Sequence, residues 1–273
     1  MEFKEKQFDG PYEVAEVEIN NKGEFFKGLL YFPPERFKQP FSVVIYFHGF
    51  PQLFPLQEIV SNYKSILELG YVFLIFNFRG YRFSDGQVSI NGQISDALKI
   101  IEFIRKFSKK EVFNLNDVNI IAHDFGAYIA LVLCSKINLI NRLLLLSPIL
   151  NLKKHVFSED FKNALEYINR YLPSNIKGVE KIDEFIKKTK KEASNKKIQT
   201  CFFSKHLKNK KLKIITGERD KITPINEIDE VFKSSNLIPE ISIIKNMDHE
   251  CIEEEDFEEI NNEIVNFFFK INK

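Results

Sequence analysis

The sequence of 273 residues has no tryptophan and only three cysteines, Cys134, Cys201 and Cys251. The cysteines show no CxxC spacing and cannot all pair within the chain, which favours a reducing compartment over an extracellular one. The first residues lack the apolar core of a signal peptide, and no apolar run is long enough to span a bilayer. We therefore expect a cytoplasmic protein without a membrane partner.

An excess of charge of one sign is also lacking. Lys and Arg number 39 against 38 Asp and Glu, so the balance predicts neither nucleic acid nor an anionic membrane as partner. The basic stretch 187–197 has no interleaved aromatic residue, and we interpret it as the solvated face of a helix. No group of residues has metal-ligand spacing, and no nucleotide fingerprint is present. Neither a metal nor another cofactor is expected.

Apolar residues make up 44% of the chain, enough for a sizeable core, and they follow alternating strand and helix patterns. Residues 14–32 pattern as an antiparallel hairpin that turns at 20–23. Further strands are expected at 41–47, 71–78, 118–122, 142–147, 211–217 and 240–245, and helices at 57–69, 92–107, about 125–136, 225–235 and 252–270. This alternation predicts an α/β fold, a mostly parallel sheet with helices on both faces, formed by residues 1–273 as a single domain.

The alternation lapses between about 150 and 208. Two helical patterns, near 158–171 and 179–193, occur there without a clear strand. We expect this segment to form a helical lid over the carboxyl ends of the strands, where open α/β sheets bind their ligands.

The stretch Ala122-His123-Asp124-Phe125-Gly126 ends one expected strand and begins a helix. That is the layout of a nucleophile elbow, in which a sharp turn raises one side chain into an active site. Asp220 follows the strand 211–217, and His249 follows the strand 240–245. Each of the three lies beyond the carboxyl end of a strand, in the order nucleophile, acid, histidine. We expect Asp124, Asp220 and His249 to meet as a catalytic triad.

Two backbone amides complete this expected site. Phe50 follows the strand 41–47, and Phe125 begins the helix after the elbow, so their N–H groups could form an oxyanion hole. Among the remaining histidines, His48 and His123 are expected to be structural. His155 and His206 are expected to lie at the surface.

These motifs resemble the α/β-hydrolase superfamily over about residues 14–270. The stretches VNIIAHDFGAYIALVL, LLLLSP and TGERDKITP are most similar to small esterases and acyl-peptidase-like hydrolases, including the cinnamoyl and feruloyl esterase group. Those proteins carry serine at the position of Asp124. The stretches HGFP and HD-x-G instead resemble epoxide hydrolases and haloalkane or fluoroacetate dehalogenases, which use an aspartate nucleophile.

The chemistry of a carboxylate favours the second resemblance. A carboxylate is already ionised near neutral pH, and its attack on an ester would give a mixed anhydride that readily reverts. Attack on a saturated carbon gives an alkyl ester, which His249, oriented by Asp220, could hydrolyse with water. We predict two-step hydrolysis of a small, largely apolar substrate, an epoxide first and an organohalide second. The alternative is an esterase scaffold whose serine is replaced by aspartate, with ester hydrolysis impaired or lost and only ligand binding retained.

The resemblance also implies groups that assist the leaving atom. Haloalkane dehalogenases commonly hold the halide with tryptophan, including one directly after the nucleophile, where this chain has Phe125. Epoxide hydrolases protonate the epoxide oxygen with two lid tyrosines. Tyr167 and Tyr171 are the candidates here, because a spacing of four residues places them on one helix face.

Overall fold

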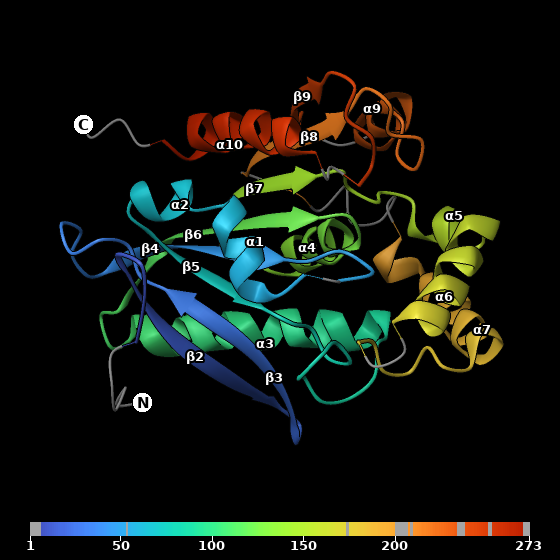
Figure 1. Ribbon diagram of the computed structural model, residues 1–273, viewed down its shortest axis with the longest axis horizontal. Helices are drawn as coiled ribbons and strands as arrows, with labels where there is room; N and C mark the ends of the chain where they lie inside the picture. Colours follow the sequence, from blue (N-terminus) through green and yellow to red (C-terminus); the bar gives the residue numbers. More distant parts are fainter. Residues whose placement is uncertain are drawn as a thin grey trace.

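A nine-stranded sheet with the order β1-β2-β3-β5-β4-β6-β7-β8-β9 runs through the computed structural model (Figure 1). The structure describes residues 7–52, 54–172, 175–199, 207, 210–233, 238–250 and 253–269. The strands are β1 Gln7–Asp9, β2 Tyr12–Asn21, β3 Glu24–Tyr31, β4 Phe41–Phe47, β5 Tyr71–Phe76, β6 Phe113–His123, β7 Ile140–Leu146, β8 Lys211–Gly217 and β9 Glu240–Ile244. The first three pair antiparallel and β3 meets β5 antiparallel, while all pairs from β5–β4 to β8–β9 are parallel. The predicted α/β class and the expected hairpin are confirmed.

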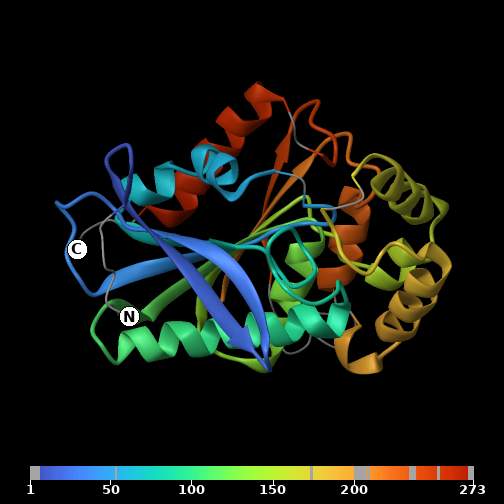
Figure 2. The same ribbon diagram turned by 60° about the horizontal axis from the view of Figure 1, so that its bottom comes forward.

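Helices cover both faces of the sheet (Figures 1 and 2). They are α1 Leu56–Asn62, α2 Ser65–Glu68, α3 Ile90–Ser108, α4 Phe125–Lys136, α5 Leu152–Val156, α6 Glu159–Tyr171, α7 Ile182–Ala193, α9 Ile225–Lys233 and α10 Glu254–Phe268, with a 3-10 turn η1 at Lys196–Ile198. The buried side chains of α3 and α4 join one core cluster, and those of α1, α2 and α10 join the other. β5 lies between these two layers, and all of its residues are buried. Its continuous apolar sequence is typical of a strand that is covered on both faces.

Two elements differ from the sequence-based expectation. The helix expected at 57–69 breaks at Tyr63, whose φ of −122° leaves the helical region. The Tyr63 ring packs in the core against Tyr46 and Phe73, and this tertiary contact outweighs helical propensity. Strand β6 begins at Phe113, five residues before the apolar run that predicted it.

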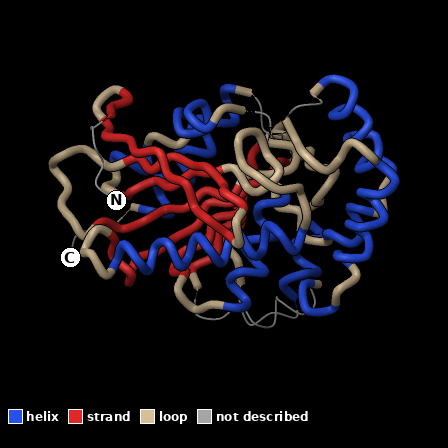
Figure 3. Tube along the Cα trace, turned by 90° about the horizontal axis from the view of Figure 1, so that it is seen from below, coloured by secondary structure: helices blue, strands red, loops and turns tan. Residues whose placement is uncertain are grey.

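The helices α5, α6 and α7 are inserted between β7 and β8 and lie beyond the carboxyl ends of the strands (Figure 1). Figure 3 shows the same arrangement from below, with helices gathered beyond one end of the strands. The insertion occupies the place expected for 150–208, although residues 200–206 lie outside the described part of the chain. It is tied to the body where Glu192 accepts a hydrogen bond from the Ile90 amide at the start of α3, at 2.8 Å.

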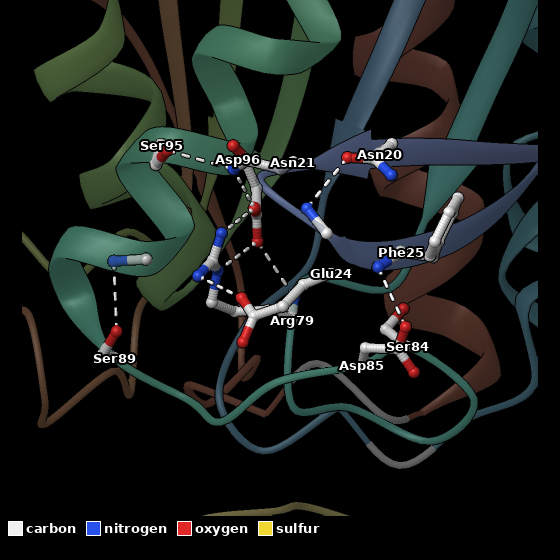
Figure 4. A network of polar contacts seen from close by, with 12 residues as sticks. Asn20, Asn21, Glu24, Phe25, Arg79, Ser84, Asp85, Ser89, Ser95 and Asp96 are labelled. Atoms are coloured by element: carbon white, nitrogen blue, oxygen red, sulfur yellow. Dashed lines mark hydrogen bonds and ion pairs between the residues drawn. The ribbon is translucent and has the colours of Figure 1, made fainter.

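A buried ionic network fixes the loop between β5 and α3 (Figure 4). The fully buried Asp96 accepts hydrogen bonds from the Arg79 guanidinium at 2.6 and 3.0 Å and from the Asn21 amide at 2.8 Å. Arg79 also pairs with Glu24 at 2.7 Å. The network joins the hairpin, the loop and α3, and this loop supplies Val88 to the wall of the candidate site.

Candidate active site

Asp124 occupies a strained turn between β6 and α4. Its φ of 50° and ψ of −120° lie outside the regions that ordinary residues prefer. Its amide donates to the Leu146 carbonyl at 3.0 Å, and its own carbonyl accepts from the Ile149 amide at 3.2 Å. Gly126 permits this turn, because a Cβ there would lie 2.3 Å from the Phe47 carbonyl oxygen. The surroundings therefore enforce the elbow geometry that the sequence predicts.

The three predicted triad residues meet at the carboxyl edge of the sheet. His249 places Nδ1 3.0 Å from Asp220 Oδ2 and Nε2 3.2 Å from Asp124 Oδ1. Asp220 is itself held by the amides of Ile222 and Thr223, each 2.9 Å from its Oδ1. Asp124, Asp220 and His249 are 6%, 5% and 7% exposed, so their charges interact in a largely dehydrated setting.

The predicted oxyanion donors lie against the carboxylate of Asp124 itself. The Phe50 amide donates to Asp124 Oδ2 at 2.6 Å, and the Phe125 amide also hydrogen-bonds to this carboxylate. Gly49 makes this approach possible, since a Cβ there would lie 2.6 Å from Asp124 Oδ2. One oxygen of Asp124 therefore fills the oxyanion site, while the other faces His249.

Opposite charges stabilise each other in this cluster. Burial alone would raise the pKa of Asp124, but the hydrogen bond and charge of His249 outweigh it and lower that pKa to about 2. Burial alone would lower the pKa of His249, but hydrogen bonds to Asp124 and Asp220 and their charges raise it to about 10. The resting site thus holds an ionised Asp124 beside a protonated His249.

The free energy of unfolding is expected to fall between about pH 6.5 and pH 10. The His249 pKa is raised from 6.5 to about 10 in the folded chain, so the folded chain holds a proton that the unfolded chain has already released. This contribution is complete below about pH 6.5 and disappears as the pH passes about 10. The melting temperature of the wild-type protein should therefore fall as the pH rises through this range, and that of His249→Gln should fall less steeply. Equal slopes for the two proteins would contradict the expectation.

Two further histidines are structural, as expected from the sequence. His48 accepts from the Phe78 amide through Nε2 at 3.0 Å, so its Nδ1 carries the proton and donates to the Gly49 carbonyl at 2.8 Å. Burial lowers the pKa of His48 and of His123 to about 4, which keeps both rings neutral.

An apolar pocket adjoins the elbow. Its walls include Phe50 and Phe125 from the body, and Leu152, Phe161 and Phe185 from the insertion. The cavity measures about 20 Å³, which is room for about one water molecule. A substrate can therefore enter only if side chains or the inserted helices move.

His155 was expected at the surface, and that expectation is wrong. It lies in α5, lines the apolar pocket, and packs edge-on against Phe161 with ring centroids 5.4 Å apart. Burial lowers the pKa of His155, so its ring is neutral near pH 7. No spacing in the sequence marks this residue, because its position depends on how the insertion folds back over the sheet edge. His206 lies outside the described residues.

The structure does not bring the two candidate tyrosines to the pocket. Tyr167 and Tyr171 are 57% and 56% exposed, and their rings contact each other at 4.8 Å on the outer surface of α6. The inner face of this helix is formed by Phe161, Leu165 and Ile168. The spacing correctly placed both tyrosines on one face, but that face points to solvent. In this structure neither tyrosine is placed to donate a proton in the pocket.

No group of three His, Cys, Asp or Glu residues within the described ranges could hold a metal ion. The helices in the same ranges include none with both the length and the hydropathy required to cross a membrane.

Curated relatives match half of the chain. The lysophosphatidylserine lipase ABHD12 of Danio rerio is 30% identical over 141 residues, which cover 50% of this chain and 35% of that protein. The same lipase of Xenopus tropicalis is 31% identical over 137 residues, covering 49% of this chain and 33% of that protein. The matches thus span about a third of the length of these relatives.

Solved structures match nearly the whole chain. The Pyrococcus furiosus esterase PF2001 superposes with a TM-score of 0.69 at 19% identity, covering 94% of this chain and 90% of that one. Est1E from Butyrivibrio proteoclasticus superposes with a TM-score of 0.66 at 15% identity, covering 94% and 100%. At these identities the likeness shows the fold alone. A family model described as alpha/beta hydrolase fold matches residues 42–185. The chain therefore belongs to the α/β-hydrolase family.

Proposed function

We propose that the chain hydrolyses a small, largely apolar alkylating substrate, an epoxide in the first instance, with Asp124 as the nucleophile. The hydrogen bonds that position the two oxygens of the Asp124 carboxylate are the main support for this proposal. Oδ2 accepts from the Phe50 amide at 2.6 Å, and Oδ1 lies 3.2 Å from His249 Nε2. Phe50 and Phe125, whose amides hold the carboxylate, also line the apolar pocket. The lowered pKa of Asp124 keeps this group ionised and ready to attack.

The filled oxyanion site favours attack on a saturated carbon over attack on an ester. An ester carbonyl would need the Phe50 and Phe125 amides to stabilise its developing oxyanion. The Asp124 carboxylate already occupies both amides. Opening an epoxide needs no such site in its first step: Oδ1 bonds to the ring carbon, and the carbon–oxygen bond of the ring breaks with its electron pair on oxygen.

The same amides are then well placed for the second step. Water attacks the carboxyl carbon of the alkylated Asp124, and the resulting oxyanion forms on the oxygen that the amides already hold. Alkylation removes the charge of Asp124, one of the two carboxylates that raise the pKa of His249. His249 therefore releases its proton to the alkoxide left by ring opening. The neutral ring then takes a proton from the attacking water, while Asp220 keeps it oriented, and passes this proton to the departing alcohol oxygen. The carboxyl proton of the regenerated Asp124 returns to His249 and restores the resting pair.

His155 is the group that we assign to the epoxide oxygen. It is the titratable side chain that the insertion contributes to the pocket wall. A neutral imidazole can stabilise a developing alkoxide by donating an N–H hydrogen bond. His155 therefore takes the role that the sequence had suggested for Tyr167 and Tyr171.

A second candidate is an esterase scaffold in which aspartate has replaced the nucleophilic serine. It is favoured by the relatives, which are named a lysophosphatidylserine lipase and esterases, and by a structure of Est1E with bound ferulic acid. On this hypothesis wild-type protein forms no covalent adduct, whereas Asp124→Ser frees the oxyanion site and gains turnover on short aryl esters.

Mass spectrometry of intact His249→Gln protein tests the first proposal against the second. After exposure to a panel of epoxides and halides, we expect a mass increase of one substrate residue that maps to Asp124, because the alkyl ester forms but is not hydrolysed. Asp248→Asn is the matched control, since it changes the exposed residue next to His249 and leaves the triad side chains intact, and it should show no lasting adduct. Absence of an adduct from His249→Gln, together with ester turnover by Asp124→Ser, would support the second candidate instead.

A further inference from the structure

The inserted helices carry a concentration of positive charge that the overall charge balance conceals. Residues 187–197 contain six lysines and one glutamate. We call the six the lysine face: Lys187, Lys188, Lys190, Lys191, Lys196 and Lys197. In the part of the chain that the structure describes, no ion pair joins any of them to a carboxylate. The acids of α7 are Asp183 and Glu184, in its first turn, and Glu192, which accepts a hydrogen bond from the Ile90 amide. Six lysines against three carboxylates leave α7 and η1 together with an excess of three positive charges.

An exposed aromatic side chain borders the lysine face at Lys190, although it comes from another part of the insertion. Phe157, which follows α5, is 51% exposed, and Lys190 Nζ lies 4.5 Å from the centre of its ring. The stretch 187–197 has no aromatic residue of its own, so only the packing of α5 against α7 creates this pairing. A lysine-rich surface that borders an exposed aromatic ring is typical of surfaces that bind at the headgroup level of a membrane.

The orientation of α7 limits how such a surface can bind. Its residues Phe185, Thr189 and Ala193 are buried against the protein, while Lys187, Lys188 and Lys191 are exposed. The helix therefore cannot lay an apolar face into a bilayer. Charge attraction must dominate, with Phe157 as a shallow apolar contact. The insertion also forms one end of the molecule, which leaves it free to approach a flat surface (Figure 2).

We propose that the lysine face and Phe157 form a docking surface for an anionic lipid membrane. A nucleic acid would match the charge but would gain less from a single exposed phenylalanine than from the several aromatic rings on which successive bases stack. The same insertion supplies Leu152, Phe161 and Phe185 to the apolar pocket, so docking would place the pocket beside a reservoir of apolar molecules. Net charge did not predict an anionic membrane as partner, because the excess of lysine is confined to the insertion and Phe157 lies outside the basic stretch 187–197.

Vesicle co-sedimentation tests the proposal independently of the chemistry at Asp124. The full chain carrying Asp124→Asn is mixed with vesicles of phosphatidylcholine alone or with added phosphatidylserine. We expect binding only to the vesicles that contain phosphatidylserine, and its loss at high salt. A triple change of Lys187, Lys188 and Lys191 to Gln should reduce the partition coefficient at least about 10-fold, since each lysine near an anionic surface contributes roughly fivefold. Phe157→Ser should reduce it by about twofold to fivefold.

A second lysine cluster offers the matched control. Lys106, Lys109 and Lys110 lie at the end of α3 that is remote from the insertion (Figure 1), and Phe107 beside them is buried. Their triple change to Gln removes the same charge and should leave binding within about twofold. Equal losses from both triples, equal binding to phosphatidylcholine alone, or binding to heparin without binding to vesicles would each overturn the proposal. Unchanged melting temperatures show that the variants are folded.

Discussion

Asp124→Asn is expected to lower turnover of the alkylating substrate by at least about 10⁴-fold, in the range found when a catalytic nucleophile is removed. The carboxamide is neutral and a poor nucleophile, so the alkyl ester cannot form. Its oxygen can still accept from the Phe50 amide, which holds Asp124 Oδ2 at 2.6 Å, so the elbow should keep its shape. Steady-state kinetics measure the loss, and circular dichroism checks the fold.

Asp248→Asn provides the control for that substitution. Asp248 precedes His249, is exposed, and caps the Glu250 amide at 2.9 Å without contacting the triad. Its loss should change turnover by less than about threefold. If Asp124→Asn kept more than about a tenth of wild-type turnover, the carboxylate could not be the nucleophile, because that residual rate far exceeds what binding and the oxyanion amides supply alone.

The second large effect is expected on stability. Asp96→Ala should lower the free energy of unfolding by about 3–5 kcal/mol, because it leaves Arg79 with an uncompensated charge in the protein interior. The Asp96 side chain is fully buried and that of Arg79 is 16% exposed, so water cannot replace the lost partner (Figure 4). Asn21 would also lose its 2.8 Å hydrogen bond to Asp96. Urea denaturation measures the change.

A surface ion pair on the same helix gives the comparison. Lys99 and Glu102 are 2.6 Å apart, but their side chains are 37% and 60% exposed. Glu102→Ala should therefore cost less than about 1 kcal/mol. If Asp96→Ala also lowered the free energy of unfolding by less than about 1 kcal/mol, Glu24 alone would be sufficient to compensate the charge of Arg79, which it contacts at 2.7 Å.

The α/β class and the positions of the parallel strands followed from the sequence because their signals are local. A strand buried on both faces must be apolar throughout, as β5 is, and a helix buried on one face must repeat with the helical period. The convergence of Asp124, Asp220 and His249 also followed from chain order, because the ends of parallel strands share one edge of the sheet. Their catalytic roles remain a prediction.

What the sequence by itself determined was therefore the architecture and the residues that could meet at the sheet edge. Tertiary structure decided which face of each inserted helix points inward. The helical period shows which residues share a face, but it does not show whether that face packs against the protein or is exposed to solvent. The tertiary structure turned Tyr167 and Tyr171 to solvent, brought His155 into the pocket, and set Phe157 beside Lys190. The tertiary structure also placed one oxygen of Asp124 within hydrogen-bonding distance of the Phe50 amide. These residues are 74 positions apart, so no local sequence pattern encodes the contact. These choices depend on packing between distant segments, where burial and electrostatics act over the whole fold rather than along the chain.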